Sequence, residues 1–150
     1  MQNKNNLKLD KAGIRFIENA EGVRLQKYKD VAGYWTIGVG HLIRSWENFD
    51  SGITQNQAEE LLSSDASGAE KSVNSLVSVC LKHNQFNALV SFVFNVGSTA
   101  FANSTLLSVL NKGDYAEAAK QFLRWDVAGG DHVAGLLARR KKEMELFLNV

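Results

Sequence analysis

The segment from Asn84 to Gly97 constrains the fold most, because it is apolar on nearly every side when drawn as a helix. A helix without a polar face has nothing to present to water, so we predict that it is the central buried helix of a helical body. Asn84 is a suitable N-cap for this helix and Gly97 a suitable C-cap. Its apolar residues are Phe86, Leu89, Val90, Phe92, Val93, Phe94 and Val96.

The chain from Thr54 onward supplies further helices to surround this segment. Thr54 and Gln57 form a capping box, which opens a long helix predicted to continue to about Val79. Later helices are predicted from Asn103 or Ser104 to Gly113, from Tyr115 to about Trp125 behind the cap Asp114, and over about 133–148 after the loop 128–130.

The first part of the chain has a different pattern. Asp10 caps a helix predicted over Lys11 to about Ala20, and Gly22 is placed to end it. An extended pattern begins at Val23 and a turn follows at 30–33. The run 34–43 is rich in β-branched and aromatic residues. This pattern predicts a small antiparallel sheet of two or three strands.

Together these elements predict an α+β fold. We expect a single domain over residues 1–150, with a small sheet lobe at about 21–53 and a larger helical lobe at about 54–150 plus the N-terminal helix. The long helix after Thr54 would join the two lobes. A substrate cleft is expected between them.

Charge and composition exclude several classes of function. The formal net charge of +1 is too balanced to indicate a nucleic-acid partner. No apolar run reaches the roughly 18 residues of a membrane span, so no stable membrane association is expected. The N-terminal residues 1–6 have no apolar run behind them, so no secretory signal is expected.

Two smaller features receive ordinary structural interpretations. Cys80 is the only cysteine and lies in an apolar run, which predicts a buried small hydrophobic residue. The basic run 139–142 is predicted to be the solvated face of a helix. No histidine or cysteine has a second one at ligand spacing, so neither a metal site nor a cofactor is expected.

The residues with the most chemical potential are Glu21, Asp30 and Thr36. They lie at a helix end, at a strand-to-turn junction and in a strand beyond the turn. Folding the hairpin back would gather them around one opening. Glycoside hydrolysis requires one protonated carboxyl group, which protects the leaving oxygen, and one ionised carboxylate, which activates water or attacks.

The local environments suggest which carboxyl group takes which role. Glu21 lies at the negative end of a helix beside the apolar Val23 and Leu25, which disfavours its charged form. Asp30 follows Lys29 in a turn with water and backbone N–H groups at hand, so it is expected to be ionised. On residue types alone, however, ordinary surface acids are the more frequent explanation of such residues.

A longer pattern favours the catalytic interpretation. Glu21-Gly22-x-Arg24-Leu25, Tyr28-x-Asp30 and Gly33-x-x-Thr36-Ile37-Gly38-x-Gly40-His41 resemble the signature of the phage-type lysozymes of glycoside hydrolase family 24, closest to the P22-like and T4-like members. Residues 85–97, 104–107 and 135–143 continue the resemblance. It covers the chain from about residue 12, and only the first ten or so residues have no counterpart.

The resemblance implies roles for particular residues. Glu21 would be the catalytic acid, Asp30 the second carboxylate and Thr36 the hydroxyl that helps to place the attacking water. An inverting reaction would then set the two carboxyl groups roughly 6.5–9.5 Å apart. Residues expected to bind the saccharide are Leu42, Phe94, Tyr34, Ser104 and Thr105, with Trp35 as a further candidate.

Other positions are implied to support the site. His41 is expected to be a structural histidine paired with Asp65, and Gly38 and Gly40 are expected to be structural glycines. The T4-like members of the family steady the catalytic glutamate with an arginine from the C-terminal region. Here Arg139, Arg140 or the local Arg24 are the alternatives.

The resemblance implies an endolysin that cuts the β-1,4 bond between N-acetylmuramic acid and N-acetylglucosamine in bacterial peptidoglycan and so lyses the host. A monomer is expected, held in the host cytoplasm until a holin opens the inner membrane. Two alternatives remain open: a catalytically weak lysozyme-fold module that binds peptidoglycan, and a lytic transglycosylase, for which Asp30 would be superfluous.

Overall fold

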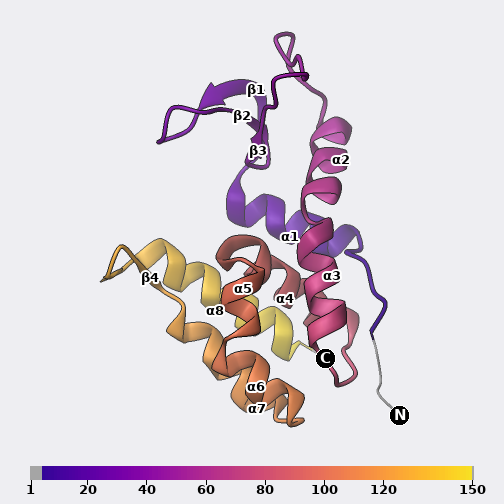
Figure 1. Cartoon of the computed structure of the whole chain (residues 1–150), viewed down its shortest axis with the longest axis vertical. Helices are drawn as coiled ribbons and strands as arrows, with labels where there is room; N and C mark the ends of the chain where they lie inside the picture. The colour runs from indigo at the N-terminus through magenta and orange to yellow at the C-terminus, as the bar shows by residue number, and fades with distance from the viewer. Residues whose placement is uncertain (1–4, 150) are drawn as a thin grey trace. The chain divides into compact units, whose positions relative to one another are not determined.

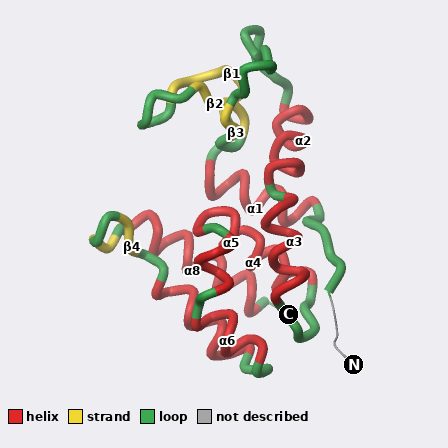
Figure 2. The backbone as a smooth tube through the Cα atoms, viewed as in Figure 1, coloured by secondary structure: helices red, strands yellow, loops and turns green. Residues whose placement is uncertain are grey.

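The computed structural model describes residues 5–149. In it the chain divides into two compact units, one over residues 14–67 and the other formed by residues 5–13 together with 68–149. We call them the sheet unit and the helical unit, and each is described by itself. Figures 1 and 2 show their elements along the chain. The predicted α+β fold is confirmed, with a small antiparallel sheet and a mostly helical remainder.

The sheet unit holds three antiparallel strands in the order β1-β2-β3, within the predicted range of two or three strands. The strands are preceded by α1 and followed by α2. The bounds are α1 Lys11–Glu21, whose first three residues belong to the helical unit, β1 Arg24–Lys29, β2 Trp35–Gly38, β3 His41–Leu42 and α2 Gln55–Asp65. The predicted capping box at Thr54 and Gln57 is present, so α2 begins where its sequence indicates.

The connection from β2 to β3 depends on glycine. Gly38 and Gly40 both have φ of +67°, a backbone conformation that other residues seldom adopt. Ile37 pairs with His41 across this turn, and Ile37 and Val39 are buried. The turn therefore fixes which residues of the small sheet enter the core of its unit and which remain outside.

The helical unit is built around α4, as predicted from its apolar sequence. Every residue from Gln85 to Val93 in this helix is buried. Phe92 is surrounded edge-on by the rings of Phe101, Phe122 and Trp125, at centroid distances of 5.3 to 6.3 Å. The bounds are α3 Ser67–Leu76, α4 His83–Val96, α5 Ser98–Ala102, α6 Thr105–Asn111, α7 Tyr115–Gln121, a 3-10 turn at Phe122–Arg124, β4 Val127–Ala128, β5 Asp131–His132 and α8 Ala134–Leu148.

One predicted element was wrong, and a short helix and a hairpin were not predicted. The long helix after Thr54 ends at Asp65, and α3 begins afresh after Ala66, which is the C-cap of α2. The weak helix formers Ser63, Ser64 and Asp65 precede this break. The short helix α5 was not predicted. The loop 128–130 is part of a hairpin in which Gly129 and Gly130 have φ of +60° and +86°, as a tight turn between β4 and β5 requires.

Cys80 also differs from its prediction, because it is exposed. The apolar run around it forms no helix or strand; it is the connection from α3 to α4, in which Val77 is buried. The carbonyl of Cys80 accepts a hydrogen bond from the Tyr115 hydroxyl at 2.7 Å. The connection is thus attached to α7 through its backbone, and the cysteine side chain has no part in the core.

The N-terminal segment has a structural role that its sequence did not indicate. It is held along the helical unit by side chains that pair with its backbone. Asn74 accepts from the Leu7 N–H at 3.0 Å and donates to the Leu7 carbonyl at 2.9 Å. Glu70 accepts from the Leu9 N–H at 2.7 Å. Residues 5–9 are therefore tied to α3 by hydrogen bonds.

Candidate active site

Glu21 is the last residue of α1, and the end of this helix is well defined. The Gly22 N–H donates to the Glu18 carbonyl at 2.7 Å, and Gly22 has φ of +83°. Glu18 is buried and its carboxylate accepts from the Gln55 side chain at 2.6 Å, which ties α1 to the start of α2. The glycine C-cap predicted here is present, and it places the exposed Glu21 immediately before β1.

Asp30 lies at the other end of β1, in the predicted turn. Its Oδ1 accepts hydrogen bonds from the backbone N–H groups of Ala32 at 2.9 Å and Tyr34 at 2.8 Å. The Gly33 N–H donates to the Asp30 carbonyl at 2.9 Å. Both side-chain bonds use one oxygen, and within residues 5–149 the other oxygen accepts none. The turn therefore fixes the direction of the carboxylate and leaves Oδ2 available to water.

Thr36 is connected to Asp30 through the backbone of Tyr34. The Tyr34 carbonyl accepts from the Asp30 N–H at 2.9 Å and from the Thr36 hydroxyl at 3.0 Å. Because the Tyr34 N–H also binds the Asp30 carboxylate, one peptide segment orients both side chains. Thr36 is only 3% exposed, so this orientation is also held by packing.

The strand register determines which predicted residues share a face with Thr36. Thr36 pairs with Tyr28 on β1 and with Leu42 on β3, and paired residues of antiparallel strands point to the same side. Leu42 is 53% exposed, so it offers apolar surface beside Thr36. Trp35 precedes Thr36 in the strand and points to the opposite face, which separates it from this group.

The remaining predicted binding residues belong to the helical unit. Phe94 is half-buried near the end of α4. Ser104 is the N-cap of α6: its hydroxyl accepts from the Leu107 N–H at 3.1 Å and donates to the Phe101 carbonyl at 2.7 Å. Since capping already uses both functions of this hydroxyl, we leave Ser104 out of the proposed site.

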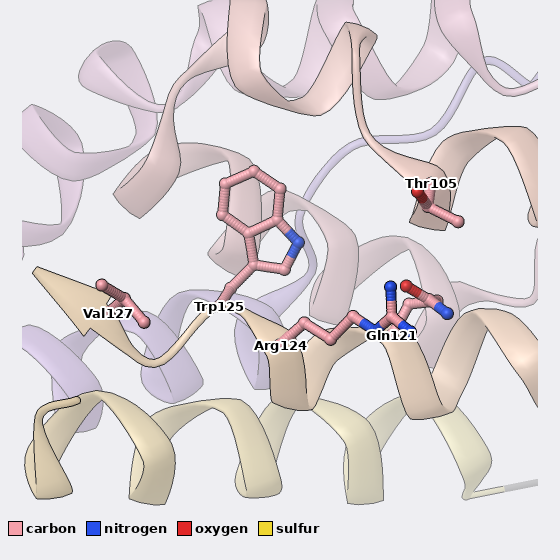
Figure 3. A pocket seen from close by; sticks show the side chains of 5 residues that line it. All are labelled: Thr105, Gln121, Arg124, Trp125 and Val127. Atoms are coloured by element: carbon pink, nitrogen blue, oxygen red, sulfur yellow. The ribbon is translucent and has the colours of Figure 1, made fainter. Parts of the chain in front are cut away.

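Thr105 is exposed and lines a pocket of about 380 Å³ in the helical unit. Figure 3 shows the Trp125 indole in the middle of this pocket, with the side chains of Gln121 and Arg124 beside each other below Thr105. Sequence reasoning missed Gln121, because a lone polar residue on a helix has no pattern that separates a ligand contact from a surface position. It is 5% exposed, yet it lines the pocket.

Comparison with known proteins identifies the family of this chain. The phage lysozyme family model matches residues 18–143. The chain belongs to the phage lysozyme family. The endolysin of Salmonella phage P22 is 42% identical over 95% of this chain and 99% of its own length. The crystal structure of a P22 lysozyme mutant has a TM-score of 0.86 at 39% identity, covering 96% of this chain and 100% of that one. The SAR-endolysin of bacteriophage PS119 is 38% identical over 87% of this chain and 78% of its own length.

Membership in the phage lysozyme family fixes the class of reaction. The protein is a glycoside hydrolase, a muramidase that acts on peptidoglycan. The predicted family, fold class and enzyme class are therefore confirmed. Within residues 5–149, no helix is long and apolar enough to cross a membrane.

The basic run 139–142 on α8 was predicted to be a solvated helix face, and only half of it is. Lys141 and Lys142 are exposed, but Arg140 is completely buried and Arg139 is 9% exposed. Both arginines hydrogen-bond to the buried carboxylate of Glu143, and the Arg140 guanidinium lies 5.0 Å from the centre of the Phe92 ring. Glu143, in the next turn of α8, supplies the negative charge that these arginines contact. The first half of the basic run therefore faces the core of the helical unit.

His41 lies between two carboxylates in the sheet unit. Its Nδ1 is 2.8 Å from the Asp65 carboxylate, which is the predicted pairing, and its Nε2 is 3.0 Å from Glu47. Burial lowers the pKa of His41, but the hydrogen bonds to Asp65 and Glu47 raise it above the ordinary value overall. The pKa of Glu47 is lowered: burial would raise it, but the bonds from the Arg44 N–H and from His41 outweigh burial.

These shifts predict a pH-dependent contribution to stability. A histidine whose folded-state pKa is raised stabilises the fold fully below its unfolded pKa of about 6.5, and the effect is lost as pH rises through the folded value. Replacement of His41 by Gln should lower the free energy of unfolding by about 1–3 kcal/mol near pH 5.5, and by less near pH 9. Urea denaturation of both proteins across this pH range measures the difference.

A matched control uses another histidine that contacts a carboxylate, His132. His132 lies 2.8 Å from Asp126, but its side chain is 80% exposed. The His132→Gln substitution should change stability by less than about 0.5 kcal/mol at either pH. An equal loss for His41→Gln at pH 5.5 and pH 9 would show that the two carboxylates do not act through the charge of His41.

Proposed function

We propose that Glu21 is the general acid of this muramidase and that Asp30 and Thr36 position the water that attacks the sugar. Glu21 would donate its proton to the oxygen that leaves. The ionised Asp30 would accept a proton from the water, and Thr36 would hold the water through its hydroxyl. These roles fit a hydrolysis that needs one acid and one base on opposite faces of the sugar ring.

The observation that carries this proposal is the link through Tyr34. One peptide segment accepts from Thr36 at 3.0 Å and donates to Asp30 at 2.8 Å, so the same segment orients both side chains. Precise positioning of a water is worth large factors in rate, because the attack is fast only from the correct direction. We propose the inverting reaction, in which the water held by Thr36 is activated by Asp30 and attacks the sugar in a single step.

Candidate glycan contacts are proposed in each unit by itself, and the whole chain is proposed to be a single lysozyme domain. Leu42 offers apolar surface beside Thr36, and the exposed Tyr34 lies in the same turn as Asp30. In the helical unit, Phe94 and Thr105 are the predicted contacts. The pocket beside Thr105 combines an indole with an amide and a guanidinium, which suits the apolar faces and hydroxyl groups of a sugar.

The Asp30→Asn substitution tests the proposal for the second carboxylate. An asparagine oxygen can still accept from Ala32 and Tyr34, so the turn should be kept while the negative charge is lost. We expect kcat for peptidoglycan hydrolysis to fall by about 10²–10⁴-fold, as for the loss of a general base. Clearing of chloroform-treated Gram-negative cells measures the rate, and a thermal melt monitors folding.

The matched control is Asp114→Asn. Asp114 caps α7 and accepts from the Glu117 N–H at 3.0 Å, so it too is a carboxylate held by a backbone donor. Asparagine is an equally good cap, and both activity and stability should be close to those of the wild type. An Asp30→Asn variant as active as Asp114→Asn would contradict a catalytic role for Asp30.

We also propose that the enzyme, as a monomer, reaches the wall only after a holin opens the inner membrane. Relatives named SAR-endolysins are similar to this chain, so the release route requires its own experiment. Expression in a Gram-negative host with and without a co-expressed holin measures lysis directly. Lysis that needs the holin supports this route, and equal lysis without it contradicts the proposal.

A further inference from the structure

The sheet unit contains a pocket of its own, on the face of the sheet opposite to Thr36. It has a volume of about 280 Å³, and β1, β2 and the segment 43–50 line it. We call it the Trp35 pocket; its lining includes Lys27, Trp35, Ile43, Arg44, Phe49 and Asp50. Trp35 and Thr36 are neighbours in one strand and point to opposite faces, so a ligand of this pocket would not occupy the site proposed for catalysis.

The central feature of the pocket is an exposed aromatic ring with cations beside it. Trp35 is 45% exposed. The Lys27 ammonium lies 4.5 Å and the Lys29 ammonium 5.2 Å from the centre of its ring. Trp46 is 77% exposed, and the Arg44 guanidinium lies 5.6 Å from its ring. Each of these two exposed tryptophans therefore has a cation at its ring, in a position where the core does not need the indole.

The pocket lining also includes two acids, Glu47 and Asp50, and both already have partners. Lys27 is paired with Asp50 at 2.6 Å. The Glu47 carboxylate is engaged by His41 and by the Arg44 N–H. Across the described part of the chain, no carboxylate forms an ion pair with the side chain of Lys29 or Arg44. The pocket therefore presents two cationic groups at the edge of an aromatic surface, which suits a ligand that carries carboxylates on an apolar frame.

The substrate of this enzyme offers such a ligand. Peptidoglycan is a polymer whose peptide stems carry free carboxylates and alkyl groups, and many stems lie near any bond that is cut. We propose that the Trp35 pocket binds a peptide stem of peptidoglycan, with carboxylates at Lys29 and Arg44 and the alkyl part on Trp35. This site would hold the enzyme on the network while the glycan is cut elsewhere, raising its effective concentration at the wall.

An anionic membrane fits these observations less well. Membrane surfaces bind extended basic patches, at about 1 kcal/mol for each Lys or Arg. The two cations without an ion pair, Lys29 and Arg44, border a concave pocket and do not form such a patch. A single carboxylate-bearing stem matches this size and charge. The proposal rests on peptidoglycan as the substrate, and it does not depend on the roles of Glu21, Asp30 or Thr36.

A binding experiment without turnover tests the proposal. The protein has three tryptophans, so its indole N–H resonances are assignable in an NMR spectrum. The probe is the synthetic stem tetrapeptide L-Ala-γ-D-Glu-meso-diaminopimelate-D-Ala, and the control is the same peptide with its carboxylates amidated. We expect the free acid to shift the Trp35 resonance and leave Trp125 unchanged, and the amidated peptide to bind much more weakly. A third titration uses vesicles with anionic phospholipid in place of the peptide.

Charge-neutral variants make the test specific. Lys29→Gln and Arg44→Gln should each weaken tetrapeptide binding about three- to fivefold, as for the loss of an exposed ion pair. The matched control Lys141→Gln, on the exposed side of α8, should have no effect. Arg44→Gln should also slow the clearing of intact sacculi but not the hydrolysis of a short soluble glycan without peptides.

Several outcomes would overturn the proposal. These are no shift at Trp35 with millimolar tetrapeptide, equal binding of the amidated peptide, or a response to anionic vesicles alone. The last outcome would assign the face to a membrane surface instead. Failure here would leave the Asp30→Asn result unaffected, because the binding measurement involves no turnover.

Discussion

The Glu21→Gln variant is expected to lose about 10²–10⁴-fold in kcat on peptidoglycan while its fold is retained. Glutamine has nearly the same size and shape but no acidic proton to donate. The sugar oxygen would then have to leave as an alkoxide, which is the step that the acid prevents. Glu21 is exposed at the end of α1, and the Gly22 cap and the Glu18–Gln55 bond that define this end do not involve its side chain.

The comparison variant is Glu60→Gln, an exposed glutamate on α2 of the same unit. It should keep full activity, and the thermal melts of both variants should match that of the wild type. Initial rates of clearing on chloroform-treated Gram-negative cells provide the measurement. Equal rates for Glu21→Gln and Glu60→Gln would remove Glu21 from the chemistry and revive the alternative of a module that only binds.

The largest stability effect is expected at Glu143. Its carboxylate is completely buried, accepts from the Ser91 hydroxyl at 2.6 Å and lies in contact with Arg139 and Arg140. Burial raises the pKa of Glu143, and the contacts with Arg140, Ser91 and Arg139 oppose this rise. Substitution by alanine would remove the buried carboxylate that both guanidinium groups contact. Such a loss costs about 3–5 kcal/mol.

For a protein of this size, the cost corresponds to a fall in Tm of roughly 6–20 °C. Glu145→Ala, two residues further along α8 and exposed, is the matched control and should change stability by less than about 0.5 kcal/mol. Calorimetry of both variants at one pH measures the difference. If Glu143→Ala were no less stable than Glu145→Ala, the buried network would not hold the helical unit together.

The features that the sequence predicted correctly depend on residues that are close together in the chain. The caps at Gly22 and Thr54 and the glycines of the β2–β3 turn each involve residues a few positions apart, so their patterns are visible in the sequence. The buried helix α4 was predicted for a similar reason, since its apolar residues leave no polar face. Asp30 was predicted to meet backbone N–H groups because a turn supplies them.

Features that depend on distant parts of the chain were missed. Arg139 and Arg140 have the pattern of a surface run until Phe92 and the Ser91 hydroxyl arrive from α4. Gln121 becomes a pocket residue only when α6 packs beside α7 and brings Thr105 to it. The contact of Glu47 with His41 comes from an irregular segment with no period to mark it. In each case the partner lies outside the local pattern.

The central claim is that a water molecule, placed by Asp30 and Thr36, cuts the glycan. The most direct test is mass spectrometry and NMR of the products formed in water enriched in oxygen-18. The account predicts one heavy oxygen at each new N-acetylmuramic acid reducing end, released first as the α-anomer. Anhydro-muramyl ends without heavy oxygen, the mark of a transglycosylase, would contradict it. A β-anomer released first would show a covalent route and remove the role given to Thr36.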